Sequence, residues 1–279
     1  MTAATSPPHL TTDPETTERL RRCVLRAVAA AHELVRELRL TEPELHALVR
    51  FLTEVGTADE FMLLSDVTHT SILVDTLGQA ADAGGATSSN VEGPLYRPGS
   101  PVLDTPAVLD HAEQGDDALL LSGRVVEAGT GTPVAGAILD IWQTNQRGLY
   151  ENQDAAQPEH NLRGRVRCDA EGRYEVRTVV PGPYRIATSG GPVFALLTSL
   201  GRHDTRPAHI HVKASAQDHE ALTTQLFIAG DPWLEDDVIG AVKPELVITP
   251  RPTELPGVVA PRRAFAAGFN IALRPVAGG

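Results

Sequence analysis

The chain has 279 residues, 42% of them hydrophobic and 22% charged, which is ordinary for a globular protein with one large domain or two modest ones. Its net charge of −12 argues against a surface built for nucleic acid or anionic membranes, since both need basic patches. With only two cysteines, Cys23 and Cys168, the chain has neither a disulfide framework nor a thiolate metal site. Because the sequence lacks a signal-peptide core or a membrane-length apolar run, we expect a soluble, cytoplasmic protein.

The first hundred residues are predicted to be mainly helical, after a disordered leader over residues 1–12. Asp13 followed by Pro14 is typical of a helix N-cap and the first helical position. Apolar residues then recur at helical spacing over residues 20–38. The sequence therefore predicts a long amphipathic first helix.

Two capping-box pairs divide the next stretch. The pairs are Thr41 with Glu44 and Thr57 with Glu60. The first pair predicts a helix that ends at Gly56, and the second predicts one continuous helix that ends at Gly78. Residues 79–90, rich in alanine, glycine and serine, are predicted to form a linker.

From about residue 118 the pattern changes to short strands separated by turns. The clearest candidates cover residues 119–127, 133–142, 172–180, 208–214, 222–229 and 264–273. Strands without intervening helical patterns favour an antiparallel sandwich over a parallel sheet. We therefore predict an α+β protein, with a helical domain over residues 13–100 and a β-sandwich domain over residues 101–279.

A His-x-His pair stands out in the predicted strand over residues 208–214. Alternate residues of a strand share a face, so His209 and His211 point the same way and can converge on one ion. The alternative is a polar strand face that happens to carry two histidines. Tyr150 and Tyr184 sit in loops at strand ends, where a scaffold can aim them, although loop tyrosines also serve as packing groups. Tyr174 alternates like a packing residue.

Several motifs occur in one order along the chain. They are Glu-Gly-Pro-Leu-Tyr at 92–96, a Gly-x-Tyr loop ending at Tyr150, Asn-Leu-Arg-Gly at 161–164, Pro-Gly-Pro-Tyr at 181–184, Arg-Pro-Ala-His-x-His at 206–211 and Leu-Thr-Thr-Gln-Leu at 222–226. Together they resemble the intradiol ring-cleavage dioxygenases, in the branch of catechol and hydroxyquinol 1,2-dioxygenases. The resemblance implies that the sandwich is the catalytic domain and the helical part a dimerisation domain.

The resemblance also implies one Fe(III) per subunit. The ligands it implies are Tyr150, Tyr184, His209 and His211. Phenolate is a hard anionic donor suited to a trivalent ion, and imidazole suits iron generally. By the same resemblance, Arg206 supports negative charge that develops on the substrate ring, a role that fits a permanently charged guanidinium. Gln225 is then expected to polarise the site from the neighbouring strand.

The resemblance assigns a substrate pocket to residues before and beside the sandwich. They are Leu63, Asp66, Val91, Pro94 and Leu95, together with Arg206. Asp66 can accept a hydrogen bond from a ring hydroxyl, which suits hydroxyquinol; the alternative is that it caps a local hydrogen-bond network. Residues 63–75 look more like hydroxyquinol-cleaving members, whereas residues 224–233 look more like catechol-cleaving ones. We expect catechol, cleaved with O2 to cis,cis-muconate; the alternatives are hydroxyquinol, giving 3-hydroxymuconate or maleylacetate, and chlorocatechol.

The resemblance implies a homodimer through the N-terminal helices, often around a bound phospholipid. An ordinary domain core explains the same apolar stripe. Three rival functions stay open on the residues alone. A non-catalytic β-sandwich binding module makes the His-x-His incidental, a zinc hydrolase needs a third ligand in register, and an Fe(II) oxygenase with two histidines and one carboxylate needs a carboxylate in a comparable motif.

Overall fold

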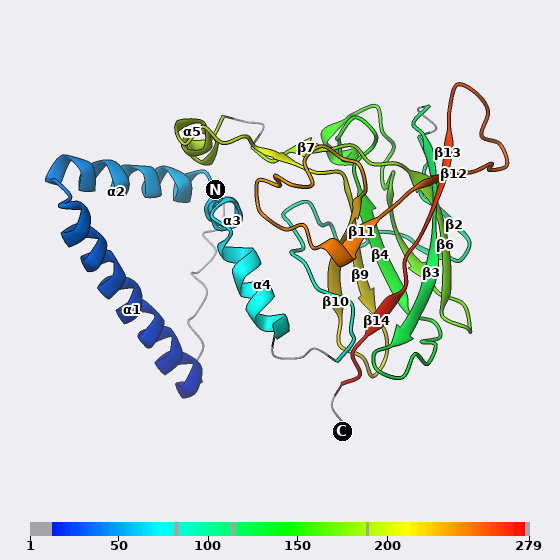
Figure 1. Cartoon of the computed structure of the whole chain (residues 1–279), viewed down its shortest axis with the longest axis horizontal. Helices are drawn as coiled ribbons and strands as arrows, with labels where there is room; N and C mark the ends of the chain where they lie inside the picture. Colours follow the sequence, from blue (N-terminus) through cyan, green and yellow to red (C-terminus); the bar gives the residue numbers. More distant parts are fainter. Residues whose placement is uncertain (1–12, 81–83, 113–114, 188–189, 277–279) are drawn as a thin grey trace, which may run out of the picture. The chain divides into compact units, whose positions relative to one another are not determined.

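The structure, a computed structural model, describes residues 13–80, 84–112, 115–187 and 190–276 (Figure 1). The predicted leader lies outside these residues. The chain divides into two compact units, Met1–Thr57 and Ala58–Gly279. The predicted boundary between domains at residue 100 stays a prediction.

The first unit contains helices α1 (Pro14–Leu38) and α2 (Glu42–Thr57). The Asp13 carboxylate accepts a hydrogen bond from a backbone N–H of the first turn of α1, as its N-cap position predicts. At the start of α2 the Glu44 carboxylate accepts from the Thr41 backbone N–H at 2.8 Å, which confirms half of the predicted capping box. No helix in the described part of the chain combines the length and apolar character needed to cross a bilayer.

Both helices of the first unit expose large apolar side chains. Those on α1 are Leu20, Val24, Leu25, Val28, Leu34, Val35 and Leu38, and those on α2 are Leu45, Leu48, Val49 and Leu52. None of the α1 residues, all of which the structure describes, is buried in the single chain. Exposed apolar residues repeated along an amphipathic helix normally mark an interaction surface.

The second unit opens with two helices where the sequence predicted one. They are α3 (Phe61–Val67) and α4 (Thr70–Ala80). The helix breaks because His69, between them, adopts a left-handed conformation with φ of 60°. The prediction of one continuous helix is therefore wrong, since apolar periodicity does not register a single left-handed residue.

The predicted capping box of Thr57 with Glu60 is also wrong. Thr57 ends α2, and Glu60 makes no capping bond to its own helix. Its carboxylate instead accepts from the Val193 backbone N–H at 2.9 Å, in the first turn of a helix that the sequence analysis missed, α5 (Pro192–Ser199). A carboxylate at a helix N-terminus satisfies a free N–H and interacts favourably with the helix dipole, whichever segment supplies it.

The described strands of this unit form two six-stranded sheets and one two-stranded ribbon. In order across the first sheet the strands are β1 (Val102–Asp104), β5 (Arg163–Arg167), β4 (Ile138–Gln143), β9 (His209–Ser215), β10 (Leu222–Ile228) and β11 (Val247–Ile248). The second has β12 (Arg251–Pro252), β13 (Ala264–Gly268), β3 (Ala118–Glu127), β6 (Arg173–Val179) and β2 (Ala107–Val108), with β14 (Ile271–Leu273) also on β3. Strands β7 (Tyr184–Arg185) and β8 (Thr205–Arg206) pair with each other, and 3-10 turns η1 (Glu151–Gln153) and η2 (Pro244–Leu246) lie in connections.

The predicted α+β fold with a β-sandwich is confirmed. The central pairs β5–β4–β9–β10 and β3–β6 are antiparallel, whereas β1, β2, β11, β13 and β14 join in parallel. Figure 1 shows β9 and β10 in one layer and β3 and β6 in the other. One core cluster unites the facing sides, with Ile210 and Val212 of β9 against residues such as Leu121 of β3. Tyr174 packs in this core as predicted, and its hydroxyl donates to the Phe269 carbonyl at 2.6 Å.

The other face of the first sheet carries a row of polar and aromatic residues. Arg163, Trp142, His211 and Gln225 stand directly opposite one another on β5, β4, β9 and β10. Because alternate strand residues face opposite sides, the apolar partners of this row fill the core while the row itself faces away from it. All four are buried, so other segments cover this face.

Candidate active site

Two imidazoles converge on the covered face of β9. His209 and His211 are each 2% exposed, and their Nε2 atoms lie 3.1 Å apart. Nδ1 of His209 donates to the Pro207 carbonyl at 2.7 Å, so Nε2 is the unprotonated nitrogen whose electron pair can bind a metal. Burial, reinforced by the charge of Arg206, lowers the pKa of His209 to about 3, and burial lowers the pKa of His211 well below its usual value. Both rings are therefore neutral at physiological pH, as metal ligation requires.

His211 is held by stacking. Its Nδ1 atom is buried without a hydrogen-bond partner among the described residues. Its ring lies against the Trp142 indole, with centroids 4.6 Å apart and planes 7° from parallel. Trp142 ends the predicted strand over residues 133–142, but sequence reasoning gave it no role.

The two predicted tyrosines meet the histidines. The rings of Tyr150 and Tyr184 lie edge to face at 5.4 Å, and Tyr184 lies 5.5 Å from the His209 ring. Tyr150 is 1% exposed, and its hydroxyl has no hydrogen-bond partner among the described residues. Burial, and then the neighbouring Tyr184, raises the pKa of Tyr150 well above 10. An orphaned buried hydroxyl is costly, so its position indicates a partner beyond the protein's own atoms.

Backbone contact between two loops brings these tyrosines together. Gly182 N–H donates to the Asn145 carbonyl at 2.9 Å, and the Thr144 hydroxyl donates to the Gly182 carbonyl at 3.0 Å. A Cβ on Gly182 would lie 2.2 Å from the Gln146 carbonyl oxygen, so only glycine permits this approach. Gly148 makes the matching contact from the other loop, with φ of 78°.

We expect Gly182→Ala to destabilise the protein and to weaken metal binding, because the added methyl group must push the two tyrosine loops apart. Overpacking of this kind typically costs about 1–3 kcal/mol of the free energy of unfolding. Thermal unfolding and iron content measure the two effects. Gly84→Ala is the control for the loss of a glycine alone, because Gly84, like Gly182, has no positive φ and a Cβ there meets nothing within 4 Å.

The donor set fits a ferric ion. Two nitrogens that bind one ion at about 2.1 Å and at right angles lie about 3.0 Å apart, close to the separation of the two histidine Nε2 atoms. The phenol oxygens supply hard donors for a trivalent ion. Within the described ranges there is no group of three or more His, Cys, Asp or Glu residues that could hold a metal, so neither the zinc hydrolase nor the Fe(II) oxygenase gains support.

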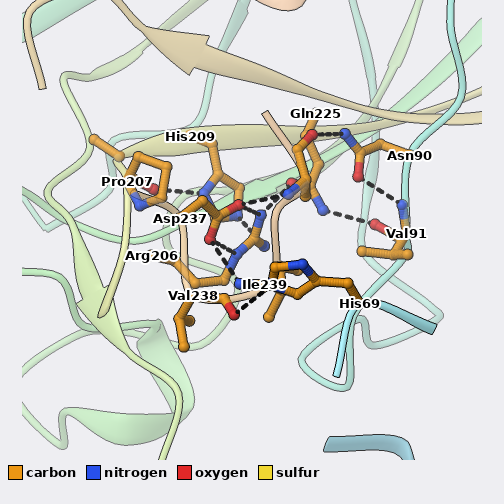
Figure 2. Close-up of polar contacts among 12 residues, drawn as sticks. His69, Asn90, Val91, Arg206, Pro207, His209, Gln225, Asp237, Val238 and Ile239 are labelled. Atoms are coloured by element: carbon orange, nitrogen blue, oxygen red, sulfur yellow. Dashed lines mark hydrogen bonds and ion pairs between the residues drawn. The ribbon is translucent and has the colours of Figure 1, made fainter. Parts of the chain in front are cut away.

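Arg206 lies beside these donors and is 2% exposed (Figure 2). Its Nη2 donates to Gln225 Oε1 at 2.8 Å, and its Nη1 lies 3.2 Å from His209 Nε2. Burial acts to lower the pKa of the guanidinium, but the charge of Asp237 and then the Tyr184 phenol raise it above its ordinary value. Gln225 is fixed in turn, because its Nε2 donates to the Val91 carbonyl at 2.7 Å.

A cavity of about 100 Å³ opens onto Arg206 and Tyr184. Its lining includes all five of the other predicted pocket residues, Leu63, Asp66, Val91, Pro94 and Leu95. The structure adds Gly93, Gln153, Arg185, Ile186 and Ile239, which the sequence analysis missed. Burial raises the pKa of the Asp66 carboxyl, against the opposing effects of Ser71 and Arg206.

Comparisons with known proteins agree with this arrangement. The family described as catechol dioxygenase N terminus matches residues 17–86, and the dioxygenase family matches residues 91–275. The chain is 38% identical to a hydroxyquinol 1,2-dioxygenase of Rhizobium sp. (strain MTP-10005) over 222 residues, which cover 77% of this chain and 74% of that protein. It is 36% identical to a chlorocatechol 1,2-dioxygenase of Pseudomonas putida over 227 residues, which cover 81% and 85% of the two chains.

Solved structures match over almost the whole chain. A hydroxyquinol 1,2-dioxygenase from Pseudomonas putida DLL-E4 superposes with a TM-score of 0.84 at 34% identity, covering 95% of this chain and 94% of that one. A catechol 1,2-dioxygenase from Pseudomonas arvilla C-1 gives a TM-score of 0.83 at 34% identity, covering 97% and 88%. Enzymes of this kind are dimeric and depend on iron. The family matches and these relatives agree with the β-sandwich and the paired tyrosines and histidines. The chain therefore belongs to the intradiol ring-cleavage dioxygenase family, of the catechol 1,2-dioxygenase type.

Proposed function

We propose that this protein holds one Fe(III) per subunit on two phenolates and two imidazoles and opens a catechol-type ring with O2, with hydroxyquinol as its preferred substrate. The ligands in this proposal are Tyr150, Tyr184, His209 and His211. The observation that supports it is the convergence of two neutral Nε2 atoms and two phenols at one buried point, with the Tyr150 hydroxyl otherwise orphaned.

When bound, the ferric ion would gather the two neighbouring hydroxyl oxygens of the substrate and withdraw electron density from the ring. Ring opening then places both atoms of O2 in a dicarboxylate, so catechol gives cis,cis-muconate and hydroxyquinol gives 3-hydroxymuconate, a tautomer of maleylacetate. Tyr184 lines the cavity, whereas Tyr150 is almost fully buried. Of the two phenols, Tyr184 is therefore the one that an entering substrate can displace.

The other residues of the site position charge and exclude water. Arg206 holds a fixed positive charge at the cavity wall, where it stabilises negative charge that develops on the substrate oxygens and ring. Gln225 keeps the guanidinium in place through its Oε1. Leu63, Val91 and Ile239 give the cavity apolar walls that keep water from the ring.

Asp66 favours hydroxyquinol over catechol. A carboxylate that faces a substrate cavity is desolvated, and burial accordingly raises the pKa of Asp66. The third hydroxyl of hydroxyquinol can donate a hydrogen bond to it, whereas the corresponding edge of catechol is a C–H. Catechol, the expectation from the sequence, stays the second candidate, because much of the lining is apolar and does not demand the third hydroxyl, as with Leu63, Val91 and Ile239.

An assay of the iron-loaded protein with hydroxyquinol, catechol and chlorocatechols, beside an Asp66→Leu variant, tests this proposal. We expect kcat/KM for hydroxyquinol to exceed that for catechol, and the substitution to lower the ratio by about 10- to 100-fold, the effect of losing a hydrogen bond to a charged group. A ratio that Asp66→Leu leaves unchanged contradicts the role of Asp66. Absence of ring cleavage with every substrate would contradict the proposed function.

A second variant at this position, Asp66→Asn, has an expected signature in stability. Since the folded-state pKa of Asp66 is raised, its carboxyl favours folding while protonated and loses that contribution as the pH rises through the folded-state pKa. Asp66→Asn should therefore unfold at a higher temperature than wild type at pH 7. That advantage should shrink toward pH 4, and a loss of stability at pH 7 would contradict it.

We also propose that the chain forms a homodimer through α1 and α2, with a phospholipid as an accessory ligand in their apolar surface. The exposed apolar faces of both helices support this assembly. Light scattering should give twice the chain mass, and Val24→Glu, on the exposed face of α1, should shift the protein toward the monomer. A monomeric wild type would overturn the dimer. The cytoplasmic location stays a prediction.

A further inference from the structure

Asp237 binds the Arg206 guanidinium from the side away from the cavity. Its two carboxylate oxygens accept from Nε and Nη2 of Arg206, each at 3.2 Å (Figure 2). Both side chains are almost fully buried, at 3% and 1% exposed for the arginine and the aspartate. Arg206 lines the cavity but Asp237 does not, so the pair presents its positive end to the substrate.

The Asp237 carboxylate is itself anchored by the loop that follows it. It accepts from the backbone N–H of Ala241 at 3.0 Å and of Ile239 at 3.4 Å. Burial acts to raise the pKa of Asp237, but the charge and hydrogen bonds of Arg206, with the Ala241 N–H, hold it below the ordinary value. The carboxylate therefore stays charged, and it has no rotational freedom to follow a displaced guanidinium.

This loop connects the arginine to two walls of the cavity. Ile239 lines the cavity directly. The Ala241 carbonyl accepts from Asn90 Nδ2 at 2.8 Å, and Asn90 Oδ1 accepts from the N–H of Val91, which also lines the cavity. Figure 2 shows Asp237 and Ile239 beside Arg206, and Asn90 next to Val91.

The remaining contacts of Arg206 show how the two hydrogen bonds to Asp237 orient the guanidinium. With Nε and one N–H of Nη2 engaged by Asp237, the fork can only direct Nη1 toward His209 and the other Nη2 hydrogen toward Gln225. Gln225 is neutral and makes one bond to the guanidinium, so it cannot fix the plane of the group alone. A bidentate carboxylate does fix that plane, because fork and carboxylate match in geometry.

We propose that Asp237 is a positioning residue for ring cleavage, acting through Arg206 to hold the guanidinium at the place where charge develops on the substrate. The proposal rests on the proposed function of Arg206. Displacement of a charged group by about 1 Å can cost about 100-fold in rate. Asp237→Asn should therefore lower kcat by about 10- to 100-fold with a smaller change in KM, and Asp237→Glu should restore part of the loss.

A double-mutant cycle tests the proposal, with Asp237→Asn, Arg206→Ala and the combined variant as iron-loaded full-length proteins. In the Arg206→Ala background, Asp237→Asn should change kcat by less than about 2-fold, because its effect acts through the missing arginine. Iron content and the ferric–tyrosinate absorption should stay as in wild type in all three. Equal losses from Asp237→Asn in both backgrounds, or unchanged kcat in the wild-type background, would overturn the proposal.

Asp117→Asn is the matched control, because Asp117 is a buried carboxylate bound to an arginine, Arg263, outside the cavity. It should lower the unfolding temperature without lowering kcat per bound iron. If Asp237→Asn does not fold, the same cycle with Asp237→Glu decides the question. Full turnover in Arg206→Ala would contradict the proposed role of Arg206. Additive effects of the two substitutions in the cycle would contradict only the positioning role of Asp237.

Discussion

Tyr150→Phe should weaken and shift the ferric–tyrosinate absorption of the protein, since Tyr184 is then the remaining phenolate ligand. It should also lower the iron content and reduce turnover by more than about 100-fold. Loss of a partner outside the ligand set typically costs 10- to 100-fold in metal affinity or activity, and loss of a ligand should exceed about that range. The substitution removes one oxygen atom and keeps the ring. Packing around this buried side chain is thus preserved.

In the metal-free protein, Tyr150→Phe should not lower the free energy of unfolding. The Tyr150 hydroxyl is buried without a hydrogen-bond partner among the described residues, so its removal should leave the free energy of unfolding of the apoprotein unchanged or raise it. Tyr174→Phe is the matched control, since the Tyr174 hydroxyl donates to the Phe269 carbonyl. It should cost about 1 kcal/mol of stability and leave the iron content and colour intact. Unchanged iron content and absorption in Tyr150→Phe would remove this tyrosine from the ligand set.

Arg206→Ala should keep the iron and the colour but lose most turnover. The four proposed ligands do not include the arginine, whereas its charge at the cavity wall is positioned to act on the substrate. Removal of one preorganised group that stabilises developing charge costs about 100- to 1,000-fold in kcat. Purified protein assayed for iron, absorption and single-turnover rate separates these effects.

Arg206→Ala should also lower the stability of the protein, because it breaks the buried ion pair with Asp237. It leaves Asp237 charged and without its guanidinium partner, and breaking a buried pair in this way typically costs about 3–5 kcal/mol. Arg206→Lys, which keeps the charge but not the fork, should recover stability more than it recovers turnover. Unchanged turnover in Arg206→Ala would take the arginine out of the mechanism.

Local periodicity and family motifs predicted much of the site. Strand alternation alone places His209 and His211 on one face, because the period of two is a property of the backbone. The structure adds that Trp142 and Gln225 stand opposite His211 on the neighbouring strands. That arrangement depends on strand register, which a single sequence does not encode locally.

Other parts of the site could not be predicted in this way. Asp237 lies 31 residues beyond Arg206, in a segment without regular periodicity, and its contact depends on how that loop folds over the sheet. Glu60 looked like the cap of its own helix, but its carboxylate bonds to Val193, 133 residues away. Short-range patterns identify a capping residue type, whereas tertiary packing decides which helix receives the cap.

Diffraction from crystals of the iron-loaded protein, recorded at the iron absorption edge, tests the central claim most directly. We predict one anomalous peak per subunit within bonding distance of four atoms, the hydroxyl oxygens of Tyr150 and Tyr184 and Nε2 of His209 and His211. A peak at any other place would contradict the account, and so would a peak beyond bonding distance of the Tyr150 or the Tyr184 hydroxyl oxygen.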